Sequence, residues 1–117
     1  MSINSFEEII NINDRKIEKL HVKLWGQDVN VKQLSSEQAE EISVRFSGIA
    51  DDKEKMIGMR TSLVRISLVD DSGQLLIKND NQAKQLGEKS SDAIKEIFEF
   101  CMEFNGFNSK VEDDEKN

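Results

Sequence analysis

The sequence predicts an α+β fold in which an N-terminal β-hairpin is followed by three to four packed α-helices. Between residues 20 and 31, aliphatic and polar residues alternate with a period of two, which is typical of strands. After residue 35, apolar residues recur at helical spacing, with Ser before the runs and Gly after them. The 117 residues suit one domain, which we expect over residues 1–107, followed by a flexible acidic tail over 108–117.

The N-terminal segment predicts a short helix and then the hairpin. Ser5 and Glu8 have capping-box spacing, and a helix this short must dock or fray. For the hairpin, Gly26-Gln27 fits a two-residue loop with glycine first. Counting back from that loop pairs Trp25 with Asp28, Leu24 with Val29, and Val22 with Val31. In this register all the aliphatic residues fall on one face of the hairpin. Ile17 is out of phase, which predicts a later strand start or a bulge.

Two helices are expected in the middle of the chain. Ser35 and Gln38 form a second capping box, before an apolar stripe of Ala39, Ile42 and Phe46 and a C-terminal Gly48. A charged connector over 50–55 leads to a helix over about 54–69, with a stripe of Met56, Met59, Leu63 and Ile66. The alternative for residues 64–69 is a strand, because Val64, Ile66 and Leu68 also alternate.

The C-terminal half predicts a turn and two further helices. Residues 70–73 form the turn, 75–77 a short extended piece, and 80–86 about two helical turns ended by Gly87. The last helix is capped by Ser90 or Ser91 and stopped by Gly106. Its stripe is Ala93, Ile94, Ile97, Phe98, Cys101 and Phe104.

Composition restricts the possible partners and compartment. The net charge of −7 argues against nonspecific binding to nucleic acid and against an anionic membrane surface, and it leaves a basic or neutral protein partner compatible. A single cysteine excludes an internal disulfide framework and suggests a buried thiol in a reducing compartment. The N-terminus lacks the pattern of a signal peptide, and the apolar runs are too short to span a bilayer. We expect a cytosolic protein.

No constellation of residues predicts catalysis, a cofactor or a metal site. His21 is the only histidine and has no ligand-spaced partner, so a solvated strand residue is favoured. Cys101 lies near a helix C-terminus among phenylalanines, which favours an inert structural thiol. Residues 70–73 resemble part of a calcium loop, but Leu75, Leu76 and Ile77 stand where ligands should follow. We therefore expect a protein that is not an enzyme.

Six apolar residues are candidates for contact with a protein partner. Trp25 falls on the polar face of the expected hairpin, where another segment of the chain or a partner must cover it. Several apolar residues make the last helix apolar on more than one side, which predicts burial by the rest of the domain or by a second protein. Methionines near residue 56 fit either the core or an adaptable surface. The candidates are Trp25, Met56, Met59, Phe100, Met102 and Phe107.

The order of motifs in the C-terminal half resembles a known family. The segment from Ser67 to Leu76 reads SLVDDSGQLL, followed by LGEKS at 86–90 and an amphipathic helix that ends at Asn105-Gly106. In this order and spacing the chain resembles the tail assembly chaperones of long-tailed (siphovirus-type) bacteriophages and prophages. Leu24, Trp25, Gly26 and residues 29–31 are similar to the N-terminal pattern of that family. No family motif marks individual binding residues.

The resemblance implies a scaffold-like role in the host cytoplasm. Such chaperones bind the tape measure protein, keep it soluble, help to recruit tail tube protein, and are absent from the mature virion. Coating a long partner implies a homo-oligomer. Ribosomal frameshifting is also implied, and Glu115-Lys116-Asn117 permits the slippery codons GAA-AAA-AAC. The alternative function is an acidic phage inhibitor or DNA mimic that acts on a host factor, although lysines are interspersed among the acids.

Overall fold

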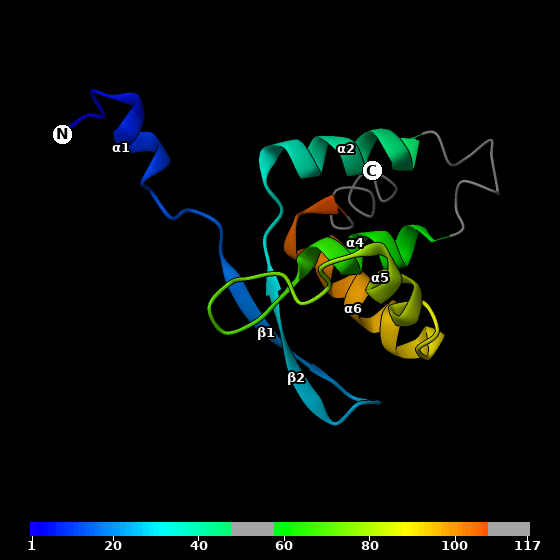
Figure 1. The fold of residues 1–117 in the computed structure, drawn as a ribbon. Helices are drawn as coiled ribbons and strands as arrows, with labels where there is room; N and C mark the ends of the chain where they lie inside the picture. The colour runs from blue at the N-terminus through cyan, green and yellow to red at the C-terminus, as the bar shows by residue number, and fades with distance from the viewer. Residues whose placement is uncertain (48–57, 108–117) are drawn as a thin grey trace, which may run out of the picture.

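The computed structural model describes residues 1–47 and 58–107, which form a three-stranded antiparallel sheet covered by helices (Figure 1). The predicted α+β class with an N-terminal hairpin is confirmed. Four predictions concern residues outside these ranges: the C-terminal Gly48 of the first middle helix, the charged connector with Met56, the acidic tail, and the slippery site at Glu115-Lys116-Asn117. The elements are α1 (Phe6–Ile10), β1 (Ile17–Val22), β2 (Gln27–Lys32), α2 (Ser36–Ser47), α4 (Met59–Ser67), β3 (Leu68–Val69), α5 (Asp80–Leu86) and α6 (Ser91–Phe104).

The hairpin forms, but its predicted register is wrong. Val22 pairs with Gln27 rather than with Val31, so the turn contains residues 23–26 instead of Gly26-Gln27 alone. The backbone N–H groups of Trp25 and Gly26 both donate to the Val22 carbonyl, at 3.1 and 2.9 Å. Gly26 closes the turn at φ +64°, a conformation that glycine adopts without steric cost. This longer, helix-like turn removes Leu24 and Trp25 from the strands.

The same aliphatic side chains share one face of the hairpin in the predicted and in the observed register. The displacement from Val31 to Gln27 is four residues, an even number, so no side chain changes face. Val22 and Val31 are both fully buried. Ile17 pairs regularly with Lys32 and lies on the opposite face, so the expected late start or bulge does not occur.

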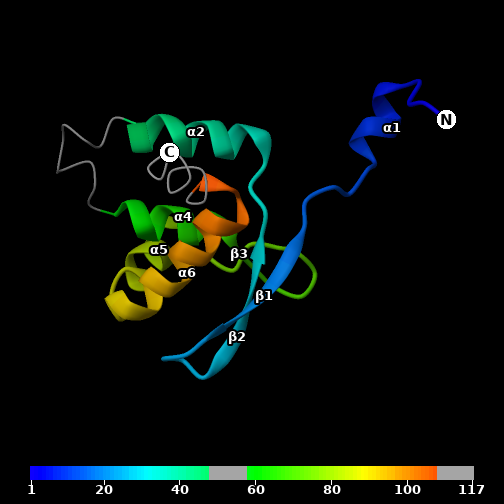
Figure 2. The same cartoon turned by 180° about the vertical axis from the view of Figure 1, so that it is seen from behind.

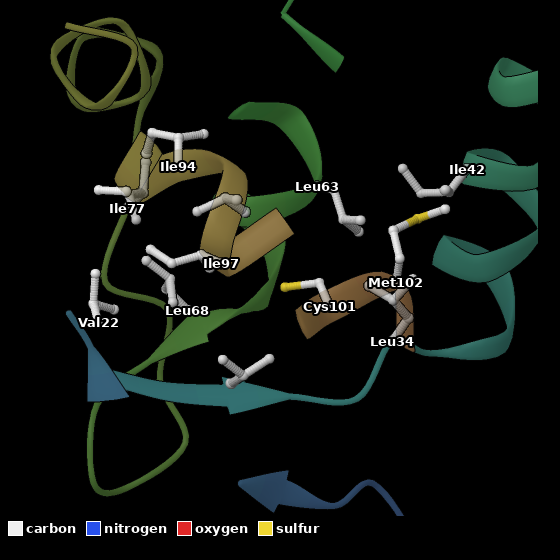
Figure 3. Close-up of a cluster of buried hydrophobic side chains, with 13 residues drawn as sticks. Val22, Leu34, Ile42, Leu63, Leu68, Ile77, Ile94, Ile97, Cys101 and Met102 are labelled. Carbon is white, nitrogen blue, oxygen red and sulfur yellow. The ribbon is translucent and has the colours of Figure 1, made fainter. Parts of the chain in front are cut away.

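The core lies between the sheet and helices α4 and α6. These two helices pack against each other, and α6 also contacts β1. Figure 3 shows side chains from the strands, from α2, α4 and α6, and from the segment before α5 converging in one cluster. Its most buried members, all at 0% exposure, are Val22, Val31, Leu63, Val64, Ile97 and Cys101.

Both readings of residues 64–69 describe part of the observed structure. Helix α4 ends at Ser67, whose buried hydroxyl donates to the Leu63 carbonyl at 2.8 Å. Leu68 and Val69 then form β3, which pairs with β2 through Val31 and Asn30. The chain leaves the helix here because β2 offers a free edge for pairing, which local propensity does not reveal.

The predicted caps are present at α2 and α6. In the α2 capping box, Ser35 Oγ accepts from the Gln38 N–H at 3.2 Å, and Gln38 Oε1 accepts from the Ser35 N–H at 3.0 Å. Ser90, rather than Ser91, caps α6. Helix α5 has the predicted bounds, but Gly87 ends it with φ −65°, so no left-handed glycine is needed there.

Helix α1 stands apart from the rest of the protein. Figures 1 and 2 show it projecting from the start of β1, away from the sheet and the other helices. Ser5 caps it as expected, since its Oγ accepts from the Glu8 N–H at 3.2 Å. None of its residues is buried. The helix is therefore formed but not docked on its own domain.

Candidate partner-binding groove

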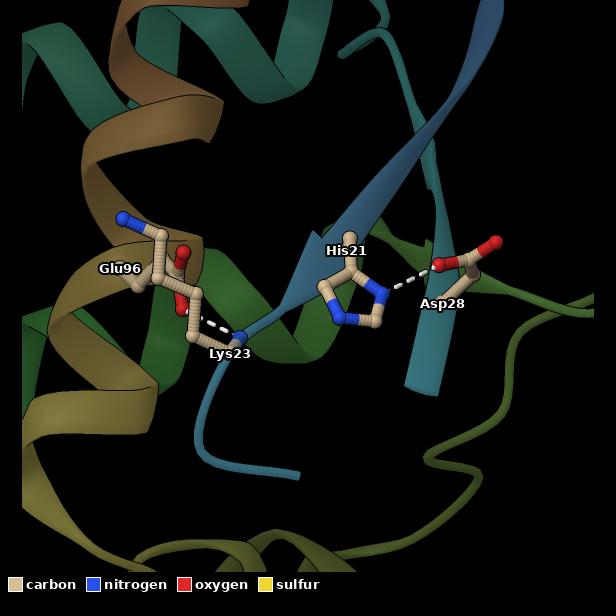
Figure 4. Close-up of polar contacts among 4 residues, drawn as sticks. All are labelled: His21, Lys23, Asp28 and Glu96. Atoms are coloured by element: carbon tan, nitrogen blue, oxygen red, sulfur yellow. Dashed lines mark hydrogen bonds and ion pairs between the residues drawn. The ribbon is translucent and has the colours of Figure 1, made fainter. Parts of the chain in front are cut away.

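The polar side chains near the hairpin make an ordinary surface contact. His21 Nδ1 lies 2.8 Å from Asp28 Oδ1, directly across the hairpin, and both side chains are more than half exposed (Figure 4). Exposed ion pairs contribute little to stability. Among residues 1–47 and 58–107, no group of three His, Cys, Asp or Glu side chains could hold a metal ion.

A groove lies where the hairpin turn meets the outer face of α6. The backbone N–H of Lys23 donates to Glu96 Oε1 at 3.0 Å, which ties the turn to the helix (Figure 4). The resulting hairpin–α6 groove has a volume of about 690 Å³. It is lined by Lys23, Leu24, Asp92, Lys95, Glu96, Glu99, Phe100 and Glu103.

Leu24 and Phe100 give this groove its apolar surface. Leu24 is 61% exposed because the four-residue turn lifts it out of the sheet. Phe100 is half-buried, and its ring centroid lies 5.7 Å from that of Phe104. Phe100 was predicted from the excess apolar residues of the last helix. Leu24 was missed as a binding residue because the predicted register buried it on the aliphatic face.

The rim of the groove is acidic. Asp92, Glu96, Glu99 and Glu103 line it at spacings that repeat along one face of α6. Only Lys23 and Lys95 oppose these four carboxylates among the lining residues. An apolar strip bordered by carboxylates suits a partner segment that carries both apolar and basic side chains.

Trp25 lies at the same turn and contacts a second, smaller hollow. The side chain is half-buried and packs against the core cluster. A hollow of about 280 Å³ lies between Trp25 and Lys89, bordered by Gln27, Asp28 and Val29. The tryptophan is thus covered in part by its own chain, which was one of the two expected arrangements, and part of it remains open to solvent.

The other predicted contact residues lie mainly in the interior. Met59 and Met102 are each only 8% exposed, so both lie in the interior, which was one of the two expected arrangements, and neither contributes to an accessible surface. Figure 3 shows Met102 directed toward Ile42 of α2. Phe107 packs edge-on against Phe46, with ring centroids 6.3 Å apart. Ile42 and Phe46 of α2 lie against Met102 and Phe107, a contact that helical periodicity does not specify.

Cys101 has the environment of a structural thiol. It is fully buried, and burial raises the pKa of its thiol to about 11, although the Ser67 hydroxyl partly opposes this shift. A protonated, enclosed thiol is a poor nucleophile. Its position agrees with the expected buried thiol.

Comparison with models of protein families, with curated proteins and with solved structures found no match. In the described ranges, 1–47 and 58–107, no helix combines the length and the apolar character needed to cross a membrane.

Proposed function

We propose that this protein is a phage tail assembly chaperone that binds the tape measure protein, keeps it soluble and helps to recruit tail tube subunits. The observation that carries the proposal is the hairpin–α6 groove, an apolar strip with an acidic rim on a chain that is otherwise strongly charged. Tape measure proteins are long and helical, and an amphipathic helix binds by laying its apolar face in such a groove. The role is one of binding rather than catalysis.

The residues of the family resemblance give the proposal further support. Asp70 and Gly73 organise the turn after β3, Ser90 caps α6, and Asn105 ends it. Each of these residues helps to fix α6 or the sheet on which the groove depends. The proposal accordingly connects the motif order of the chain with the surface that would bind the partner.

The direct test is co-expression with the tape measure protein encoded beside this gene. We expect the wild-type chain to keep that protein in the soluble fraction, and Leu24→Asp with Phe100→Asp to abolish the effect by placing charge in the apolar strip. Val44→Asp is the matched control, because Val44 is 71% exposed on α2 outside the groove. Circular dichroism verifies that each variant is folded. Solubilisation that persists in the double variant would overturn the groove, and the absence of a tape measure gene nearby would overturn the function.

The row of carboxylates on α6 favours one alternative, an acidic inhibitor or DNA mimic that acts on a host factor. Four acids along one helix face form a row of negative charge, as a polyanion does. In that case Glu96→Lys with Glu99→Lys would abolish binding to a basic host protein, and added salt would weaken it steeply. Leu24→Asp would have little effect. The tape measure proposal expects the reverse dependence on these residues.

A further inference from the structure

The first 14 residues form an arm that is both apolar and acidic. The helix in this arm buries none of its residues against the rest of the chain. Phe6 is 70% exposed, Ile9 52% and Ile10 62%. Glu7, Glu8 and Asp14 are its charged side chains, and it contains no lysine or arginine. A five-residue helix is unstable alone in water, and adjoining exposed apolar side chains mark an interaction site.

The root of this arm is held firmly. Arg15 donates from Nε to the Gln33 carbonyl at 2.9 Å and from Nη2 to Gln38 Oε1 at 3.2 Å. The backbone N–H of Gln33 donates to the Lys16 carbonyl at 2.8 Å. These bonds fix the direction in which the chain leaves the sheet, and Figure 2 shows α1 beyond them, directed away from the body.

A second groove of the protein has the complementary character. The α2–α4 groove has a volume of about 410 Å³ and is lined by Gln38, Glu41, Ile42, Arg45, Ser62, Arg65, Ile66, Leu75, Ile77 and Lys78. Its apolar members come from α2, α4 and the segment after β3, and Leu75 is 43% exposed. Three of its side chains are basic and one is acidic.

The ion pairs already present in the α2–α4 groove do not prevent docking. Arg45 lies 3.8 Å from Glu41, and Arg65 lies 2.9 Å from Asp80, with exposed partners in both pairs. Such surface pairs contribute little to stability because water screens them, so an arriving carboxylate can replace them. The hairpin–α6 groove, with four acids against two lysines, would instead repel the arm.

We propose that the arm of one copy docks in the α2–α4 groove of a second copy. Phe6, Ile9 and Ile10 cover the apolar floor, and Glu7 and Glu8 face the basic rim. Each copy carries one arm and one groove, at different places on its surface, so the contact is head-to-tail and builds a ring or an open filament. The second copy is the occupant because α1 points away from the groove of its own chain.

The proposal is tested with two complementary variants of the full chain. The arm variant carries Phe6→Asp and Ile9→Asp and keeps its groove. The groove variant carries Arg45→Glu and Lys78→Glu, both exposed positions, and keeps its arm. At about 100 μM, where a contact with a dissociation constant of that order is half occupied, we expect the wild type to sediment above the monomer and each variant alone as a monomer.

An equimolar mixture of the two variants should form a heterodimer and nothing larger, because only one arm–groove contact remains. Combining Glu7→Lys and Glu8→Lys with Arg45→Glu and Lys78→Glu in one chain should restore association by exchanging the charges. Val44→Asp should associate like the wild type. A monomeric wild type, a mixture that stays monomeric, or variants that associate unchanged would each overturn the proposal. Because no partner protein is needed, the result is independent of the proposed tape measure binding.

Discussion

Asn105, at the end of α6, accepts a hydrogen bond from the backbone N–H of Leu34, 71 residues earlier in the chain. The distance from Leu34 N to Asn105 Oδ1 is 3.0 Å. The same side chain donates from Nδ2 to the Cys101 carbonyl at 2.8 Å. One amide therefore satisfies the last turn of α6 and fixes the segment that joins β2 to α2.

Replacing this amide should destabilise the protein measurably. Asn105→Ala leaves the Leu34 N–H without its acceptor in a half-buried place, and such a loss costs about 1–3 kcal/mol. Urea unfolding followed by the fluorescence of Trp25, the single tryptophan, measures the change. Asn13→Ala, at an exposed position of the N-terminal arm, is the control and should lie within about 0.5 kcal/mol of the wild type.

The Asp70 carboxylate should make the turn after β3 sensitive to acid. Hydrogen bonds from the Ser72 hydroxyl and from the Gln74 and Ser72 N–H groups lower the pKa of Asp70 below its ordinary value of 3.8. A lowered folded-state pKa means that the contribution to stability is present above pH 3.8 and is lost as the pH falls through the folded-state pKa. NMR titration should detect this lowered pKa, and Ser72→Ala should move it upward because it removes the largest cause. An Asp70 pKa that Ser72→Ala leaves unchanged would contradict this account of the turn.

The Cys101 thiol should resist modification until the protein unfolds. At pH 8 we expect slow reaction with a thiol reagent in buffer and rapid reaction in urea, because the thiol is buried and its pKa is raised to about 11. The raised pKa also stabilises the folded state below pH 9.0, and this contribution is lost as the pH rises from 9.0 to about 11. The stability difference between wild type and Cys101→Ala should therefore shrink over that interval. Equal labelling rates in buffer and in urea would show that the thiol is accessible.

Local signals in the sequence were sufficient for the elements whose ends are set by their own residues. The reciprocal bonds of Ser35 and Gln38 start α2 as predicted, and α5 has the predicted bounds. These features depend on neighbours three or four residues apart, which the sequence displays directly. The aliphatic face of the hairpin was also predictable, because alternation determines which side chains share a face.

Features that depend on distant segments were not predictable in the same way. The sequence offers both a two-residue and a four-residue turn around Gly26, and alternation cannot separate registers that differ by an even number. The pairing of β3 with β2 and the cover that α2 provides for Met102 both arise from tertiary contacts. For this reason the observed groove contains the predicted residue Phe100 and the unpredicted residue Leu24, whereas the candidates Met59 and Met102 are buried. The basic groove between α2 and α4 gave no signal because its residues come from three separate segments.

The contrast between Met102 and Leu24 gives a final prediction that separates core from surface. Met102 is 8% exposed within the core cluster, so Met102→Ala should cost about 2–5 kcal/mol by leaving a cavity. Leu24 is 61% exposed at the hairpin turn, so Leu24→Ala should change stability by less than about 0.5 kcal/mol. The urea midpoints of both variants, measured in parallel with the wild type, test these two values. An unchanged slope of the unfolding free energy against urea concentration shows that both variants unfold as the wild type does. A Met102→Ala protein as stable as the wild type would mean that this residue lies on the surface. A strongly destabilised Leu24→Ala protein would mean that Leu24 is buried in the sheet, as the register predicted from the two-residue loop requires.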